Sequence, residues 1–473
     1  MVFSSATFLF IFLPVVLILY YLVPARWRNW ILLVVSLLFY TWSEPRFIAL
    51  LLVSITADYF IARAMDSAEG SRRKGWLALS LVINIGILAY FKYANFFIDN
   101  VQQFYHWLGL EPFEWHKVAL PVGISFVTFQ KISYMVDVYR RDHAAQRRWD
   151  TLALYILMFP QLIAGPIIRY KEIVAQLHDR SATDTPDNRL NGLFRFLVGL
   201  SKKVLIANVL AQQVDVIFAA APQSLATGTA WIGMLAYTMQ IYFDFSGYSD
   251  MALGLGRMFG FSFPENFNYP YISQSFTEFW KRWHITLGHW MKDYLYIPLG
   301  GNRKGVSRTY LNLIVVFFLS GLWHGAAWTF VVWGLYHGLF LILDKWGLRK
   351  ILDRMGRYPA TLLTFLFVMV GWVIFRADTL GHALSYIRQL FAFAAPADGI
   401  LLDTRFVVML ILAVLLAFSG LIPSVEKRVN GLFDKILTPR GAIVVTVLAI
   451  LLYILNGSAL LAGGFNPFIY FRF

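Results

Sequence analysis

The chain has 473 residues, of which 58% are hydrophobic and 14% are charged, well below the about 25% of charged residues in an average soluble protein. With a mean hydropathy of +0.59, this composition excludes a soluble globular protein and predicts a polytopic membrane protein. The formal net charge of +14 comes from short basic clusters between apolar runs, so we expect no nucleic-acid partner. Cysteine is absent, which excludes disulfides, thiolate metal sites and a cysteine nucleophile.

Apolar runs of about 20 residues recur from one end of the chain to the other, a length that predicts membrane-spanning helices instead of barrel strands. We expect an all-α polytopic fold of roughly ten to twelve transmembrane helices, completed by re-entrant and interfacial helices around a central cavity. One membrane domain is expected over residues 1–473, with a motif-bearing core at about 118–345. The candidate spans are residues 7–24, 29–43, 46–63, 76–97, 118–138, 150–168, 193–218, 229–245, 309–324, 326–344, 358–376, 405–422 and 441–461.

The basic residues predict the orientation of these spans. Clusters within residues 26–28, 63–74 and 140–148 follow every second early helix, as cytoplasmic loops do under the positive-inside rule. The first apolar run has no charged n-region and no cleavage site, so it is expected to remain as a helix. Both termini are then expected on the side of the membrane opposite the cytoplasm. Two outward termini require an even number of crossings, so at least one candidate between residues 150 and 325 must be re-entrant or interfacial.

The region from Asp244 to Arg308 is expected to be irregular. It begins with a Ser-Gly turn bracketed by Asp244 and Asp250, continues through a loop with two prolines, and then becomes too charged to span. Ser275 with Glu278 predicts a helix start with a capping box, and the Trp, Tyr, Lys and Arg that follow suit a helix at the interface or in a polar cavity. Because irregular backbone at membrane depth must be covered by protein or water, we expect a buried pocket here.

Two histidines have unusual surroundings. His324 lies in an apolar run, where an ionisable side chain is costly unless it is paired or lines a wet cavity, so it is a candidate functional residue. His284 lies beside Lys281 and Arg282 on the charged segment. The alternatives are a core histidine bonded to a carbonyl for His324, and a side chain at the level of the lipid headgroups for His284.

Small residues and tryptophans surround His324 in the sequence. The small-xxx-small pairs that favour close helix packing are Gly321 with Gly325 and Gly334 with Gly338. We interpret them as packing residues that hold His324 rigidly. The side chains expected to wall its surroundings are Trp323, Trp328 and Trp333. A stiff and dry site is where general-base chemistry gains most.

The acidic residues of the irregular region have two interpretations. Asp244, Asp250 and Asp293 are expected to form structural ion pairs, or they tune the histidines. His284 and His289 are five positions apart and do not share a helix face, and there is no H-E-x-x-H or G-x-S-x-G motif. We therefore expect no metal site and no serine nucleophile of that type.

Several long motifs resemble those of one family. They are Phe279-Trp-Lys-Arg-Trp-His284 continuing to Pro298-Leu-Gly-Gly-Asn-Arg303, Tyr242-Phe-Asp-Phe-Ser-Gly-Tyr-Ser-Asp250, and Gly321-Leu-Trp-His-Gly325. With them and with Met1–Ser5 and Tyr90–Phe96, the chain resembles bacterial membrane-bound O-acyltransferases (MBOATs) of the alginate O-acetylation type over nearly its whole length. It departs from that pattern at Gly288-His289, where the family has Ser-Thr.

The resemblance implies an O-acetyltransferase of the bacterial cell inner membrane, multi-pass and with both termini periplasmic. The histidine of the Trp-His-Gly motif, His324, is implied as catalytic, and the histidine of the Arg-Trp-His motif, His284, as the second active-site histidine. The other motif residues that we expect near the substrate are Trp323, Trp283, Asp244, Asp250, Asp293 and Asn302.

The same resemblance implies the partners. The acetyl donor is expected to be cytoplasmic acetyl-CoA, with no permanently bound cofactor. The expected partners are membrane lipid and the periplasmic acetyltransferase or esterase-like proteins of an exopolysaccharide operon. Alginate is the expected polymer, with acetylated cellulose or another exopolysaccharide as the alternatives. A transporter or a scaffold subunit of polymer secretion is the alternative from a different class.

A mechanism is consistent with the residues and with the resemblance. We expect His324, neutral in its apolar setting, to take the proton of an acceptor hydroxyl as that hydroxyl attacks the thioester carbonyl. His284 or a backbone donor is expected to stabilise the oxyanion.

Overall fold

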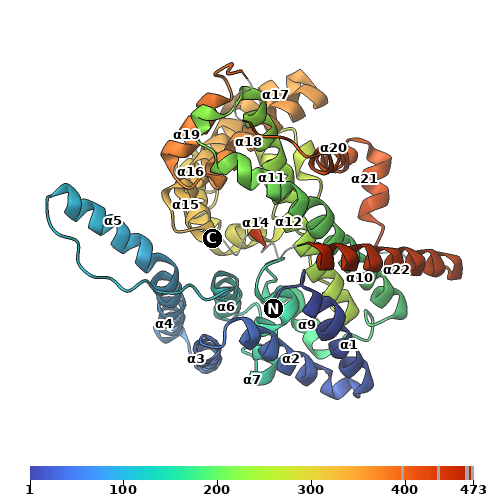
Figure 1. The fold of residues 1–473 in the computed structure, drawn as a ribbon. Coiled ribbons are helices and arrows are strands. Elements are labelled where there is room, and N and C mark those ends of the chain that lie inside the picture. The colour runs from blue at the N-terminus through green and yellow to red at the C-terminus, as the bar shows by residue number, and fades with distance from the viewer. Residues whose placement is uncertain (396–398, 434–436, 464–467, 470–473) are drawn as a thin grey trace. The chain divides into compact units, whose positions relative to one another are not determined.

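The computed structural model describes residues 1–395, 399–433, 437–463 and 468–469. These residues are helical, as predicted, and the extended backbone among them forms only an isolated antiparallel bridge between Phe267 and Trp283 (Figure 1). The contacts between residues divide the chain into two compact units. The first unit comprises Met1–Ala182 and Phe261–Phe263, and the second comprises Thr183–Gly260 and Pro264–Phe473.

The first unit consists of short and medium helices. Its elements are η1 (Phe8–Phe12), α1 (Leu13–Leu22), η2 (Ala25–Trp27), α2 (Arg28–Ser43), α3 (Ile48–Asp66), α4 (Gly70–Leu88), η3 (Ala89–Tyr93), α5 (Ala94–Trp107), α6 (Ile124–Arg140), α7 (Trp149–Leu157), α8 (Phe159–Leu162) and α9 (Tyr170–His178). Helices α3, α4 and α6 enclose a buried ion pair between Asp58 and Lys131, whose side chains are 1% and 3% exposed. Asp58 also accepts hydrogen bonds from Ser80 and Asn84, so its charge is compensated inside the helix cluster.

The second unit carries the sequence motifs. It begins with α10 (Pro186–Ser201), η4 (Lys202–Ala207), α11 (Asn208–Ala219), η5 (Pro222–Ser224), α12 (Thr227–Met258), η6 (Pro270–Ile272), α13 (Phe276–Arg282), α14 (Ile285–Met291) and η7 (Lys292–Tyr296). It continues with α15 (Val306–His324), α16 (Trp328–Leu343), η8 (Asp344–Leu348), α17 (Arg349–Met355), α18 (Arg357–Arg376), α19 (Leu380–Gln389), α20 (Thr404–Phe418), η9 (Ser419–Leu421), α21 (Pro423–Asn430) and α22 (Pro439–Ala462).

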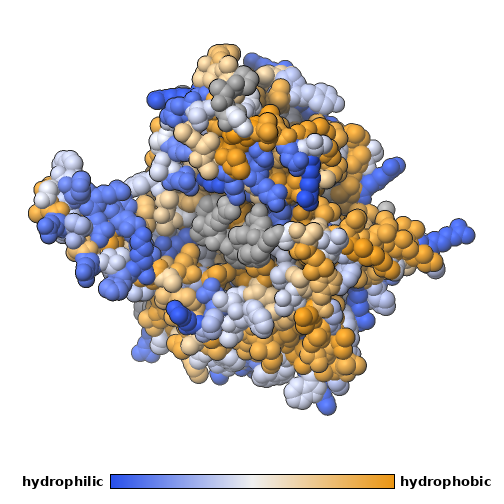
Figure 2. Space-filling model, in the orientation of Figure 1, coloured by the Kyte–Doolittle hydropathy of each residue, from blue (hydrophilic) through white to orange (hydrophobic). Residues whose placement is uncertain are grey.

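Six helical runs of the described residues are long and apolar enough to cross a membrane. They are Ile48–Asp66, Gly70–Trp107, Val306–His324, Arg357–Arg376, Thr404–Leu421 and Pro439–Ala462. All six overlap predicted spans, and the expectation of roughly ten to twelve crossings stays a prediction. The outer face of α22 gathers exposed apolar side chains, as Figure 2 shows in orange, while Asn456 on its buried side donates to the Leu197 carbonyl of α10.

The predicted span at residues 150–168 is wrong as a continuous helix. Helix α7 ends at Leu157, and the short α8 begins at Phe159, immediately before Pro160. Met158 between them leaves the helical region, with ψ 115°, because Pro160 has no N–H to donate to the preceding turn and its ring would clash with the carbonyl four residues earlier. The broken segment is buried inside the first unit.

The predicted turn between Asp244 and Asp250 is also wrong. Both residues lie within the long helix α12, which extends from Thr227 to Met258. The Ser-Gly pair serves close packing instead of a turn, because a Cβ added at Gly247 would lie 2.7 Å from the carbonyl oxygen of Gly199 on α10. Glycine therefore lets two helix backbones approach more closely than any other residue would. The irregular region begins only after α12.

Candidate functional site

Two short helices meet at His284. Ser275 is the N-cap of α13, and its Oγ accepts the Glu278 N–H at 3.2 Å as predicted. The Glu278 carboxylate accepts the N–H of Gln274 instead of that of Ser275, so the second bond of the expected capping box is displaced by one residue. The chain then breaks, so the single helix expected here is two helices. His284 caps α14 in the left-handed region, with φ 45° and ψ 52°. A non-glycine residue held in this region is uncommon and costs conformational energy, which neighbouring contacts must offset.

Asn266 holds the His284 imidazole and decides its tautomer. The side-chain oxygen of Asn266 receives the N–H and the hydroxyl of Thr286, at 3.3 and 2.8 Å, and lies 3.1 Å from His284 Nδ1. A backbone N–H can only donate, so the atom that faces these groups is the amide oxygen and His284 Nδ1 must carry the proton. Nε2 then presents a lone pair, and it makes no hydrogen bond within the described residues.

His284 is fully buried, which affects its charge. The side chain is 0% exposed, lies outside the membrane-spanning runs, and packs edge-on against Phe245 with ring centroids 4.7 Å apart. Burial lowers the pKa of His284 to about 3, because the charged imidazolium loses its hydration there. The ring is therefore neutral at physiological pH.

His324 is the last residue of α15, at its tight crossing with α16. A Cβ added at Gly321 would lie 2.3 Å from the Phe330 carbonyl oxygen, and one added at Gly334 would lie 2.2 Å from that of Phe317. No other residue fits these positions without separating the helices. The predicted packing role of these glycines is confirmed, and it places His324 at a rigid helix end.

Aromatic rings enclose His324. Its ring centroid lies 4.9 Å from Trp323, 4.9 Å from Trp333 and 5.6 Å from Phe375, and the side chain is 3% exposed. The third predicted wall residue, Trp328, does not enclose His324. It lies at the start of α16 with more than half of its surface exposed. Trp323 and Trp333 thus form the tryptophan walls.

The structure brings the two predicted histidines together. The ring centroids of His284 and His324 are 6.5 Å apart, although the residues are 40 positions apart in the chain. Trp323 contacts both rings, because its centroid is also 6.1 Å from that of His284. The arrangement places two imidazoles and two indoles in one almost dry site of the second unit. Their chemical roles stay predictions.

The other candidate residues divide into buried and exposed ones. Trp283 is 1% exposed and packs against Trp372, with ring centroids 4.7 Å apart, so it supports the site from behind. Asp293 is half-buried in η7. Asn302 is exposed in the turn that follows η7. No contact of Asn302 with the two histidines is seen within the described residues.

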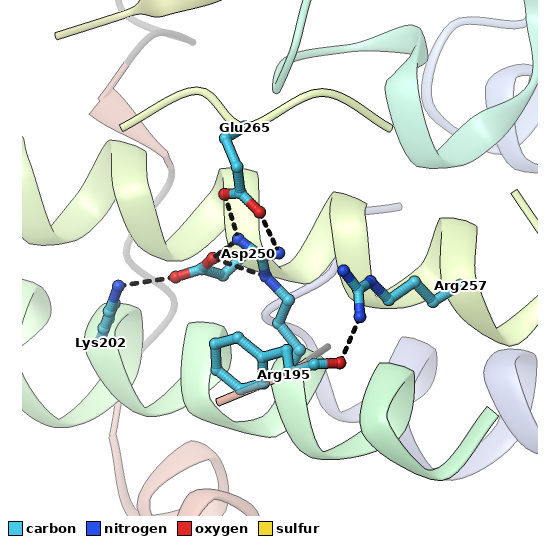
Figure 3. A network of polar contacts seen from close by, with 6 residues as sticks. Arg195, Lys202, Asp250, Arg257 and Glu265 are labelled. Atoms are coloured by element: carbon cyan, nitrogen blue, oxygen red, sulfur yellow. Dashed lines mark hydrogen bonds and ion pairs between the residues drawn. The ribbon is translucent and has the colours of Figure 1, made fainter. Parts of the chain in front are cut away.

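Asp244 and Asp250 are ion-paired, as their structural interpretation predicts. Asp244 lies 2.9 Å from Lys203 Nζ of η4, with both side chains at most 3% exposed. Asp250 binds Arg195 and Lys202 at 2.7 and 2.6 Å, and Arg195 also forms a two-fold hydrogen bond with Glu265 (Figure 3). These pairs tie α10 and η4 to α12 beside the aromatic core. Sequence reasoning missed all the basic partners.

Two further groups at the site were missed from the sequence. Asn266 lies in the proline-containing loop, and only its tertiary contact with His284 reveals its role. Ile469 near the C-terminus donates its N–H to Asp244, and Phe468 stacks on Tyr248 with centroids 4.6 Å apart. Phe468 also packs against Phe245, the ring that touches His284. Phe468 and Ile469 therefore belong to the surroundings of the histidines.

A third buried histidine was also missed. His337 on α16 is 0% exposed, and neither ring nitrogen makes a hydrogen bond within the described residues. It packs against Trp333 and Trp280, at 4.9 and 5.1 Å between centroids. Its signal in the sequence was the same as that of His324, an imidazole in an apolar helix.

Comparisons with known proteins agree with these motifs. The family model of the membrane-bound O-acyltransferases (MBOAT) matches residues 127–376, which contain the three buried histidines. The chain is 43% identical to "Probable alginate O-acetylase AlgI" of Azotobacter vinelandii and 44% identical to the protein of the same name in Pseudomonas putida, each over the whole of both chains. It is 38% identical to "Peptidoglycan O-acetyltransferase" of Helicobacter pylori, over 82% of this chain and 80% of that protein.

Proposed function

Because the chain belongs to the membrane-bound O-acyltransferase family and is an O-acetyltransferase, we propose that it moves acetyl groups across the bacterial inner membrane for O-acetylation of an exopolysaccharide. The donor in this proposal is cytoplasmic acetyl-CoA. The relatives named as alginate O-acetylases, which align with the whole chain, favour alginate over cellulose or another polymer as the final acceptor. The family and its acetylase members argue against the transporter and scaffold alternatives.

The observation that carries the proposal is the pair of buried imidazoles with centroids 6.5 Å apart. In the proposed reaction His324 takes the proton of an acceptor hydroxyl, and the hydroxyl oxygen attacks the thioester carbonyl carbon. The resulting tetrahedral intermediate collapses, the bond from carbon to sulfur breaks, and the CoA thiolate leaves with the proton that the imidazole held. The product is an acetyl ester and free CoA.

The tautomer of His284 changes the role expected for it. A neutral ring that donates from Nδ1 to Asn266 has no proton at Nε2, so it cannot donate a hydrogen bond to an oxyanion. We therefore assign His284 the role of a hydrogen-bond acceptor that holds the attacking hydroxyl beside His324. Stabilisation of the oxyanion then falls to a backbone N–H donor, the other option that the sequence left open.

Access to the histidines requires movement. His284 and His324 are at most 3% exposed, so a thioester and an alcohol reach them only when part of the aromatic wall is displaced. We propose that this restricted access keeps water from hydrolysing the thioester. A polymer chain is too large to enter such a site, which supports a periplasmic partner protein as the direct acceptor and relay.

Acetyl transfer by the purified protein tests the proposal. The chain has no cysteine, so a thiol reagent detects released CoA without background from the protein. We expect wild-type protein to release CoA from acetyl-CoA when a periplasmic partner is present, and the variant His324→Ala to release none while remaining folded in the membrane. The matched control is His178→Ala, at an exposed histidine of α9. Retained turnover in His324→Ala would remove His324 from the mechanism.

A second measurement tests the role of His284. We expect His284→Ala to lower kcat by on the order of 100-fold, because the attacking hydroxyl loses the acceptor that positions it and small misplacements of reacting groups have effects of this size. The polymer is identified by acetyl analysis of the exopolysaccharide made by cells without this protein. Loss of acetyl groups from alginate is the expected result, and unchanged alginate acetylation would contradict this choice of polymer.

A further inference from the structure

A separate cavity lies beside the aromatic wall of the second unit. It has a volume of 470 Å³ and opens between α14, η7, α15 and α16. Its apolar lining includes Ile285, Leu287, Leu313, Val316, Phe317 and Leu341. The volume lies within the range of about 300–1,000 Å³ that is usual for ligand sites. The cavity therefore has the size and lining for a hydrocarbon chain, and neither His284 nor His324 lines it.

A smaller, polar cavity adjoins it. This second hollow of 200 Å³ is lined by Glu278, Arg349 and Asp353, and it shares Thr277 and Lys281 of α13 with the apolar cavity. The shared residues place an apolar chamber and a polar chamber next to each other, with one lysine at their junction. Such a pair of chambers is complementary to an amphiphile, a molecule with an apolar chain and a polar head.

The charges around the two chambers specify the head. Lys281 and Lys292 are exposed and form no ion pair within the described part of the chain. Both are therefore available to an anion. Arg349 and Asp353 are more than half exposed and lie 3.9 Å apart, a weak surface pair that can exchange for a ligand. The ammonium group of Lys281 lies in the same cavity as the carboxylates of Glu278 and Asp353. This arrangement is complementary to a headgroup in which a phosphate is followed by an amine.

We propose that the joined cavities bind a phospholipid with an amine headgroup. One acyl chain fills the apolar cavity, the phosphate contacts Lys281, and the headgroup ammonium contacts Asp353 and Glu278. Burial of the chain supplies the affinity, and the lysine fixes the orientation.

The bound chain would support one wall of the histidine site. Trp280 lines the apolar cavity, and its ring lies 5.8 Å from that of Trp333, which is 4.9 Å from His324. Ser320, also in the lining, precedes His324 by one turn of α15. An acyl chain in this cavity therefore packs behind the aromatic residues that enclose His324.

Photochemical labelling tests this proposal. Full-length protein in lipid nanodiscs is exposed to phosphatidylethanolamine with a photoreactive group on one acyl chain, and the labelled peptides are mapped by mass spectrometry. We expect label on residues of α14 and α15 that line the apolar cavity. Leu313→Trp, which fills this cavity, is compared with Leu311→Trp at an exposed position of the same helix. Lys281→Gln is compared with Lys345→Gln at another exposed lysine.

The outcomes separate the lipid from other occupants. We expect Leu313→Trp to abolish the label and Lys281→Gln to reduce it about fivefold, the effect of one lysine on an anionic lipid group, while both controls label like wild type. Equal label in all variants would overturn the proposal. So would displacement by acetyl-CoA, which would make the cavity a donor site, or equal competition by phosphatidylglycerol, which would remove the role of the amine. Unlabelled phosphatidylethanolamine is expected to compete fully.

Discussion

The buried pair of Lys203 and Asp244 allows a quantitative test of what holds α12 in place. The atoms Lys203 Nζ and Asp244 Oδ1 are 2.9 Å apart, and the side chains are 3% and 2% exposed. Removing one partner of a buried pair leaves an uncompensated charge and costs about 3–5 kcal/mol. We therefore expect Lys203→Met, which keeps the length of the side chain, to lower the free energy of unfolding by about 3–5 kcal/mol.

The double variant Lys203→Met with Asp244→Asn separates charge from shape. It removes both charges and keeps an amide oxygen that can accept the N–H of Ile469. Because replacement of a whole buried pair is often neutral, we expect its stability to lie within about 1–2 kcal/mol of wild type.

The assay is denaturant unfolding in mixed micelles, followed by tryptophan fluorescence, with Lys345→Met at an exposed lysine as the control. A cost below about 1 kcal/mol for Lys203→Met, the range of an exposed pair, would contradict a stabilising role of this buried pair. A double variant as unstable as the single one would contradict it equally.

Three further predictions concern the histidine site. Gly334→Leu should separate α15 from α16 and reduce acetyl transfer by on the order of 100-fold, because small misplacements of catalytic groups have such effects, while Gly86→Leu in open space should not. Asn266→Leu should lower kcat about 10- to 100-fold with KM unchanged, since the His284 imidazole loses the acceptor that orients it. An unchanged kcat would show that His284 needs no such support. In ¹⁵N NMR spectra, His284 should stay neutral and protonated at Nδ1 from about pH 5 to 8, because a pKa of about 3 places its titration below this window. A titration near pH 6.5 would contradict the burial of its ring.

The sequence by itself determined the class of the protein and the residues to examine. Its apolar runs are long enough to predict membrane helices without any tertiary information, because the thickness of a bilayer sets their length. The glycines around His324 predicted a close helix crossing, since only small residues at this spacing permit it, and α15 and α16 do cross there. The motif around His284 was recognisable as a family pattern, although its break into two helices was not.

Only the tertiary structure decided which partners these residues have. The Ser-Gly pair of α12 has the composition of a turn, yet it lies within a helix because Gly247 faces Gly199 of another helix. The tautomer of His284 depends on Asn266, 18 positions earlier in the chain. Local sequence cannot specify such contacts, because the energy that selects them comes from burying polar groups and charges together, and that energy exists only once distant helices have packed.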